Sequence, residues 1–111
     1  MAFAKEIDMS ENVKDEIGSK LLFENEQVKV WDLQLQPGEN LGVHRHKNDY
    51  VLIFVGESTI RGTNADGSTR FEEDMHDGDV FVRTIEGDED IHDAHNVGDT
   101  ASRNFIIELK K

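Results

Sequence analysis

One stretch carries most of the information about this chain: Gly38-Glu39-Asn40-Leu41-Gly42-Val43-His44-Arg45-His46. Histidines spaced i and i+2 point to the same face of a β-strand, because strand side chains alternate between the two faces. Their Cα atoms then lie ~6.6 Å apart, so both imidazoles can reach one ion. A third histidine, His92, follows in the C-terminal third, with Asn96 four residues later. The pattern predicts a metal site that is built on β-strands.

The composition is that of one globular domain. The chain has 111 residues, of which 36% are hydrophobic and 32% are charged, which allows a single core and leaves no room for a second. Acidic residues outnumber basic ones 24 to 12, so the formal net charge is -12. Such a surface repels nucleic-acid backbones and anionic lipid, and neither is expected as a partner.

The chain contains no cysteine, so it has neither a disulfide framework nor a thiolate metal ligand. Only histidine and carboxylate side chains could hold an ion, which excludes zinc-finger and iron–sulfur sites.

The longest apolar run, Tyr50–Val55, is too short to span a bilayer. The N-terminal residues 1–6 lack the apolar core of an export signal, so a cytoplasmic location is expected.

Hydrophobic alternation predicts strands after an N-terminal arm at residues 1–20. Within that arm, Ser10–Ile17 could form at most one or two helical turns before Gly18. Residues 27–36 alternate cleanly between apolar and polar side chains, which is typical of a strand with one buried face. The continuous apolar run Tyr50–Val55 predicts a strand that is covered on both faces.

Further strands are expected between turns that are rich in glycine and aspartate, at residues 58–63, 68–72, 80–85, 91–96 and 103–109. Seven or eight short strands at this spacing predict an all-β sandwich or small barrel. Because alternation is only partial, a double-sheet jelly roll over residues 21–111 is favoured over a flat sheet.

The residues from Gly38 to Gly56 resemble the first motif of the cupin family, G-x5-H-x-H-x3–4-E-x6-G. The leading glycine, His44 and His46 fit its spacing, and Asp49 stands six residues before Gly56, where the family has glutamate. At a finer level, residues 23–31 and 44–50 resemble the small cupins that are grouped with a β-alanine degradation protein.

The second cupin motif, G-x5-P-x-G-x2-H-x3-N, is present in altered form. Gly78 opens it, and His92 and Asn96 provide its ending, but Thr84 replaces the proline and His92 comes three residues late. The two motifs occur in the order typical of the family. The resemblance implies a conical jelly-roll barrel of two packed sheets, with a metal ion at its centre held by four residues: His44, His46, His92 and, in the place of the ligating glutamate, Asp49.

The position of Asp49 leaves two alternatives open. Only two residues separate it from His46, so on a regular strand Tyr50, and not Asp49, shares the face of the two histidines. Either a bulge at residues 47–48 resets the register and Asp49 ligates, or the site consists of three histidines and water.

Tyr50 and Arg103 are candidate substrate-binding residues. They could line the cavity and bind a carboxylate, which arginine recognises in a bidentate manner. The simpler alternatives are core packing for Tyr50 and a surface ion pair for Arg103. Simpler explanations also suffice for four other features: exposed or supporting roles for His95 and His76, a turn role for Asn96, and a solvated loop for the acids 88–90.

An imidazole-rich site suits one divalent transition metal, namely Fe, Mn, Ni, Zn or Cu. The first functional hypothesis, which the resemblance carries, is a metal-dependent enzyme acting on a small organic acid as a dioxygenase or as a lyase or isomerase. The alternative is a non-catalytic module that binds a metal or small ligand for sensing or storage. A structural barrel without metal is a third possibility. The resemblance, together with the apolar Tyr50–Val55 strand, also implies a homodimer.

Overall fold

The computed structural model describes residues 13–110, which form β-strands and, within that range, no helix. The strands are β1 (Lys20–Glu24), β2 (Val28–Leu35), β3 (His44–His46), β4 (Tyr50–Val55), β5 (Ser58–Asn64), β6 (Thr69–Met75), β7 (Val80–Arg83), β8 (Asp90–Asn96) and β9 (Ser102–Leu109). The all-β prediction is confirmed. Residues 13–17 are not helical, and the rest of the proposed helical turns lies outside the described residues.

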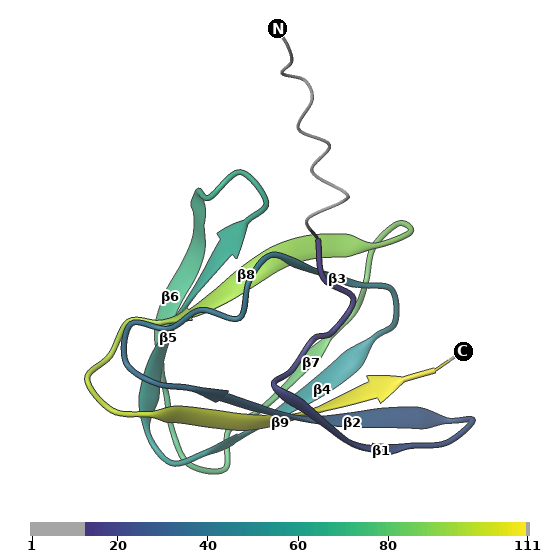
Figure 1. Cartoon of the computed structure of the whole chain (residues 1–111), viewed down its shortest axis with the longest axis horizontal. Helices are drawn as coiled ribbons and strands as arrows, with labels where there is room; N and C mark the ends of the chain where they lie inside the picture. The colour runs from purple at the N-terminus through teal and green to yellow at the C-terminus, as the bar shows by residue number, and fades with distance from the viewer. Residues whose placement is uncertain (1–12, 111) are drawn as a thin grey trace, which may run out of the picture.

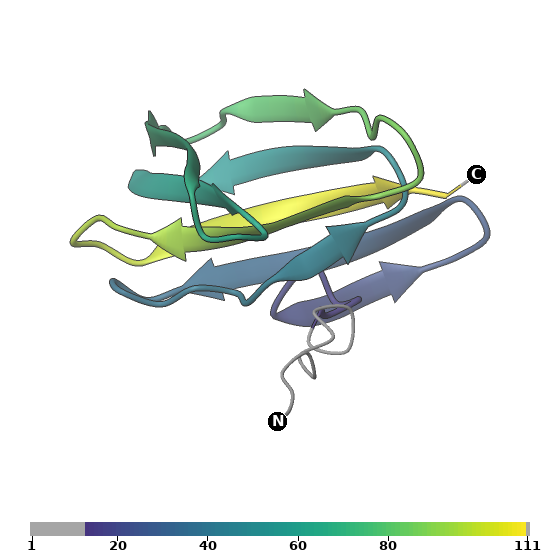
Figure 2. The same ribbon diagram turned by 90° about the horizontal axis from the view of Figure 1, so that it is seen from above.

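The strands form two antiparallel sheets, one with the order β1-β2-β9-β4-β7 and one with the order β3-β8-β5-β6. Figure 1 shows the two sheets facing each other around a shared interior. Figure 2 shows the strands of the larger sheet side by side in the order from β7 to β1. Strands far apart in sequence are neighbours, such as β2 with β9 and β3 with β8, which is the connectivity expected of a jelly roll.

The core contains the apolar side chains that the larger sheet directs into the interior, in two clusters. One cluster contains Trp31, Leu33 and Leu35 of β2 together with Ile17, Tyr50 and Ile106. A second cluster, of Phe54, Ile60 and Met75, lies between the two sheets farther along β4 and β5. The alternation in residues 27–36 therefore predicted correctly which face of β2 is buried.

Residues 13–19 have no regular structure but pack against both sheets. The Lys14 N–H donates to the Val43 carbonyl at 2.9 Å, and the Ser19 N–H donates to the Asp32 carbonyl at 2.8 Å. Ile17 is only 2% exposed. A Cβ on Gly18 would lie 2.7 Å from the Cβ of Trp31, so this approach to β2 requires glycine. The division into an arm and a domain at residue 20 stays a prediction.

Two features of the larger sheet differ from the prediction. All five residues of β1 are exposed, so no apolar period marked this strand in the sequence. The strand β4 is covered on its inner face only: among the described residues no layer lies on its outer face, where Val55 is 42% exposed. The apolar outer side chains of β4 therefore have no cover within the described chain.

The described residues contain no helix with the length and apolarity needed to cross a membrane. The cytoplasmic location stays a prediction.

Candidate metal centre

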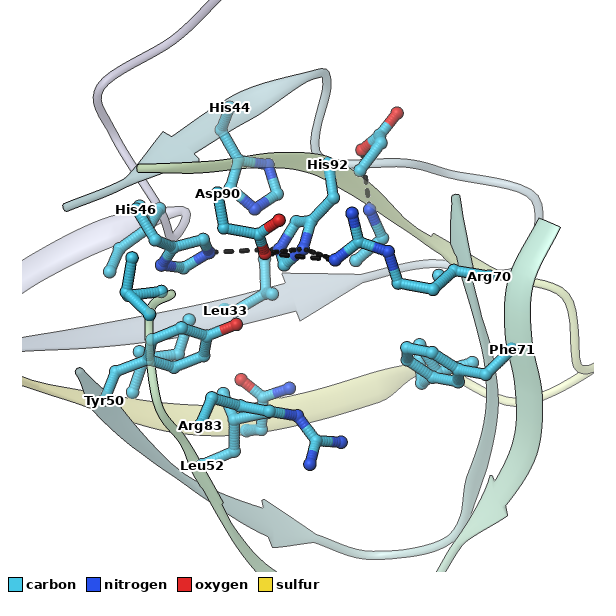
Figure 3. A pocket seen from close by; sticks show the side chains of 18 of the residues that line it. Leu33, His44, His46, Tyr50, Leu52, Arg70, Phe71, Arg83, Asp90 and His92 are labelled. Atoms are coloured by element: carbon cyan, nitrogen blue, oxygen red, sulfur yellow. Dashed lines mark hydrogen bonds and ion pairs between the residues drawn. The ribbon is translucent and has the colours of Figure 1, made fainter. Parts of the chain in front are cut away.

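The pairing of β3 with β8 brings three histidines together. His44 lies opposite His92, and His46 lies opposite Asp90. Directly opposed residues, and residues two apart on a strand, share a face, so all four side chains point into the interior. Ligand atoms of the three histidines lie within 4.8 Å of one another. Figure 3 shows the three imidazoles gathered at one wall of a cavity.

The neighbours of two of these rings fix which nitrogen faces the centre. The His44 Nδ1–H donates to the Gly42 carbonyl at 2.7 Å, so His44 carries its proton on Nδ1. His92 turns its Nδ1 toward Asp90 Oδ2 at 2.9 Å and Arg70 Nη1 at 3.1 Å. Both rings therefore direct Nε2 to the centre. A hydrogen bond on the far nitrogen of this kind is typical of metal-binding histidines.

His46 completes the centre and is held by stacking. Its ring lies parallel to that of Tyr50, with centroids 4.0 Å apart and an interplanar angle of 13°. Its Nε2 lies 3.1 Å from the Nε2 of His92, while its Nδ1 is buried without a hydrogen-bond partner. An unpartnered buried nitrogen is costly for a polar cluster alone, and the two Nε2 atoms can share at most one proton. They fit a site whose lone pairs converge on a cation.

Burial keeps all three imidazoles neutral. It lowers the pKa of His44, and it lowers the pKa of His46 to about 2 and that of His92 to about 4, with the neighbouring histidines adding to the effect at the last two. Metal ions bind the neutral form of imidazole, so no proton has to leave the site at neutral pH. A set of three histidine nitrogens suits Fe(II), Mn(II), Ni(II), Cu(II) or Zn(II).

Asp90 and Arg70 support the centre and were not predicted. Arg70 Nη1 donates to Asp90 Oδ2 at 3.0 Å. Arg70 Nη1 also lies 3.1 Å from His92 Nδ1. Arginine can only donate, and the unprotonated nitrogen of a neutral imidazole can accept, so Arg70 contacts both Asp90 and His92. Burial acts to raise the pKa of Asp90, but Arg70 and His92 outweigh it, so the net pKa is lowered and the carboxylate stays charged.

A β-bulge turns Arg70 inward. Gly62 pairs with Phe71 and Thr63 pairs with Thr69, which leaves Arg70 as the extra residue on β6. Arg70 and Phe71 are neighbours in sequence, yet both line the cavity. On a regular strand, side chains alternate between the two faces, so one of these two neighbours would point outward. The sequence pattern alone therefore could not predict that Arg70 points into the cavity.

Asp49 does not join the histidines. Its Oδ1 accepts a hydrogen bond from the Ile85 N–H at 2.8 Å, and its carbonyl accepts one from the Leu109 N–H at 2.8 Å. Tyr50 takes the inward position, as regular alternation requires. The structure thus brings together the three histidines of the predicted set and leaves Asp49 outside their cluster.

The two predicted substrate-binding residues lie on opposite faces of the larger sheet. Tyr50 lines the cavity. Arg103 does not, and this prediction is wrong: its Nε and Nη2 bind Asp32 at 3.2 and 3.0 Å on the outer face. On β9 it is Asn104 and Ile106 that point inward, while Arg103 alternates with them.

The remaining polar residues mostly have the structural roles expected of them. Asn96 is 1% exposed and donates to the carbonyls of Leu35 and Thr100 at 2.9 and 2.8 Å. His95 lies 3.1 Å from the Thr63 hydroxyl, on the face opposite to that of His92. His76 is exposed and paired with Glu57. The exception in this group is Asp90, which is the first residue of β8 and not part of a solvated loop.

The cavity beside the histidines has a volume of about 400 Å³, a size that suits a small molecule. Three of its polar groups belong to the larger sheet: Tyr50 of β4, Arg83 of β7 and Asn104 of β9. Most of the remaining wall is apolar, with the largest such side chains being Leu52, Phe54, Ile60, Phe71, Met75 and Ile106.

Comparison with solved structures identifies the fold. A cupin domain protein from Bordetella pertussis has a TM-score of 0.72 and 26% identity, over 89% of this chain and 97% of its own. An RmlC-like cupin with a double-stranded β-helix from Methanocaldococcus jannaschii has a TM-score of 0.61 and 17% identity, over 82% of this chain and 77% of its own.

A sugar phosphate isomerase of the cupin superfamily from Silicibacter pomeroyi has a TM-score of 0.53 and 20% identity, over 77% of this chain and 52% of its own. Comparison with known family profiles gives no match, and neither does comparison with curated proteins. The solved structures establish the fold, which is the jelly roll predicted from the two motifs.

Proposed function

We propose that this small cupin binds one divalent transition-metal ion through His44, His46 and His92 and uses it in a reaction on a small organic acid. The observation that carries the proposal is the set of three neutral imidazoles at the wall of a cavity of about 400 Å³, two of which direct Nε2 to a common centre because their Nδ1 atoms contact Gly42 and Asp90. A bound ion would supply Lewis-acid or redox chemistry at that wall.

Each of the surrounding residues has its own role in this proposal. Asp90 holds the ring of His92, and Tyr50 holds the ring of His46 by stacking. Burial raises the pKa of Tyr50 to about 12, so its hydroxyl keeps its proton and can donate to a substrate oxygen. Dioxygenation is expected if the resident metal is iron, and elimination or isomerisation if it is zinc or nickel.

The alternative function is a non-catalytic module that binds a metal or a small ligand. A cavity lined only by apolar groups would favour that module. Here Arg70, Arg83 and Asn104 line the cavity together with the histidines. Polar groups beside a metal-binding wall support a site that orients a reacting molecule, and we therefore prefer the enzyme.

Elemental analysis of the purified, untagged protein tests the proposal. We expect close to one equivalent of a transition metal in the native chain and loss of that metal in His44→Ala and in His92→Ala. Asp49→Ala is the matched comparison, because Asp49 was predicted as a ligand but binds the Ile85 N–H instead. It should keep its metal.

The absence of metal after reconstitution with Fe(II), Mn(II), Ni(II) and Zn(II) would contradict the proposal. Retention of the metal in His92→Ala would also contradict it, since the centre would then lie elsewhere. The metal that is found selects the assay: oxygen consumption for iron, and elimination or isomerisation of small organic acids for zinc or nickel.

We also propose that a second copy of this chain covers the outer face of the larger sheet. The outer side chains of β4 form half of a continuous apolar run, yet no described residue covers them. The strands present one carboxylate on this face, that of Asp32, and Arg103 neutralises it. For a chain with a net charge of -12, this is a face on which two copies can meet without carboxylate repulsion.

A further inference from the structure

Three polar side chains of the cavity have no hydrogen-bonding partner among the described residues. The amide of Asn104 is 4% exposed, and its Oδ1 is buried without a hydrogen bond. Within residues 13–110, neither the Tyr50 hydroxyl nor the Arg83 guanidinium forms a hydrogen bond or an ion pair. All three line the same cavity. Asn104 Oδ1 is the buried one of these three groups, and buried polar atoms are rarely left unpaired, so it indicates a missing ligand beside the half-buried Arg83.

Arg83 is the charged member of this group. It lies opposite Tyr50 in the pairing of β4 with β7, so its side chain points inward. Its Cζ lies 5.2 Å from the centre of the Phe81 ring, which holds the guanidinium without neutralising it. Figure 3 shows the guanidinium reaching into the cavity from the wall that faces the histidines.

The other charged groups in the cavity leave Arg83 available. Arg70 is committed to Asp90, and the Asp93 carboxylate accepts hydrogen bonds from Asn40 and Gly42. Glu86 is exposed and forms no ion pair with Arg83. The three histidines are neutral, so a metal ion bound by them would give the cavity a positive charge that the imidazoles do not neutralise.

We infer that the cavity takes a small organic carboxylate that carries a hydroxyl group and an apolar chain. Arg83 binds the carboxylate, the Asn104 amide oxygen accepts the hydroxyl hydrogen, and the apolar chain packs against the wall formed by Phe54, Ile60 and Met75. The inference rests on the proposed function for the reaction, but binding of the acid to Arg83 and Asn104 can be measured separately from metal binding.

Calorimetric titration of the zinc-loaded protein with 2-hydroxyisocaproate tests the role of Arg83. Its uncharged amide is the comparison ligand. We expect the acid to bind at least about tenfold more tightly than the amide, because a charge-assisted pair is lost in the amide. Arg83→Met should reduce acid binding to the level of the amide and leave amide binding unchanged. The control is Arg61→Met, which removes a half-exposed arginine paired with Glu72 outside the cavity.

The outcomes separate this inference from the proposed function. Equal affinity for acid and amide, unchanged acid binding in Arg83→Met, or no binding of either ligand would overturn the inference. Zinc content is measured in every variant and should not change. If no form of the protein holds zinc, the proposed function fails, and the same titrations on the metal-free protein decide whether Arg83 binds the acid.

Asn104→Leu gives a readout that a purely structural role would not produce. Leucine has a similar size and removes the unpaired polar atom, so we expect the unfolding temperature to rise. Binding of 2-hydroxyisocaproate should weaken about tenfold in the same variant, because the hydroxyl loses its acceptor. A lower unfolding temperature together with unchanged binding would show that Asn104 serves the fold and not the ligand.

Discussion

Asp90 is the residue on which the orientation of His92 depends. Its Oδ2 lies 2.9 Å from His92 Nδ1 and accepts the Arg70 Nη1–H at 3.0 Å. In Asp90→Asn, the amide oxygen is a weaker acceptor and the charge that holds Arg70 is lost. We expect zinc affinity to fall about 10- to 100-fold, the range typical of partners that orient a metal ligand. Competition with a chromophoric chelator measures the change.

The matched control for Asp90 is Asp88→Asn, which removes an exposed carboxylate from the loop that precedes β8. It changes the net charge equally and should leave zinc affinity unchanged. An equal loss in both variants would mean that long-range charge, and not the hydrogen bond to His92, sets the affinity.

Arg103 is expected to govern the acid stability of the fold. It is the main cause of the lowered pKa of Asp32, with a smaller contribution from Gln34, and burial opposes both. A carboxyl whose pKa is lower in the folded state adds stability above its unfolded pKa and loses it as the pH falls through the folded pKa. Arg103→Met should therefore destabilise the protein at pH 7, and the difference from wild type should shrink below pH ~4.

Urea unfolding at a series of pH values measures this effect. Because Arg103 is about half exposed, solvent screens the pair, and we expect a loss of only about 1 kcal/mol at pH 7. Arg61→Met is the control, because both side chains of the Arg61–Glu72 pair are nearly half exposed and neither carboxylate nor guanidinium is buried, so it should change little at any pH. A difference between Arg103→Met and wild type that stays constant down to pH 2 would exclude Asp32 as the cause.

The histidines could be predicted from the sequence because their arrangement follows from strand geometry. Two histidines at i and i+2 must share a face, and the order of the motifs indicated His92 as the third. Arg103 was misplaced because both faces of β9 carry apolar residues: Phe105 and Ile107 outside, Ile106 inside. With apolar side chains on both faces, alternation shows which residues share a face but not which face is inside.

At the scale of elements, the contact between β5 and β6 shapes the cavity. Gly62 pairs with Phe71 just before the bulge at Arg70. A methyl group at Gly62 would overlap the Phe71 ring, so Phe71 lies where only glycine leaves room for it. Gly62→Ala should destabilise the fold by about 1–3 kcal/mol, since the ring must move into the cavity or away from the core. Urea unfolding measures the loss.

The double variant Gly62→Ala, Phe71→Leu tests the cause of that loss. A leucine side chain is smaller than the ring, so part of the stability should return relative to Gly62→Ala alone. If the two substitutions are simply additive, the overlap with Phe71 is not the reason for the destabilisation.

The elements that the sequence failed to predict are those without a hydrophobic period. The strand β1 has five exposed residues and is held by its pairing with β2, a contact that no local pattern records. The bulge on β6 is set by the pairing of β5 with two neighbours, β6 and β8. Runs such as Tyr50–Val55 were found at their observed bounds because burial of one face leaves an apolar signal in the sequence itself.

At the scale of the whole molecule, the outer face of the larger sheet is an apolar surface that no described residue covers. One row of apolar side chains crosses all five strands through directly paired residues, in the order Phe23, Val30, Ile107, Val51 and Val82. The ends of the row are the most open, with Phe23 53% and Val82 64% exposed. A twofold axis through such a face would pair the row with its own copy.

Sedimentation velocity should therefore report a dimer for the wild-type chain and a monomer for Val82→Lys. A lysine on this face puts an unpaired charge into the contact, once in each copy, and such a charge is costly to bury. Val97→Lys is the control: it adds the same charge at the end of β8, in the smaller sheet, and should leave the dimer intact.

Added salt should strengthen the wild-type dimer, since it screens the repulsion between two chains of charge -12. A monomeric wild type, or a dimer that survives Val82→Lys but not Val97→Lys, would move the contact to another face and leave the outer apolar row to a different partner.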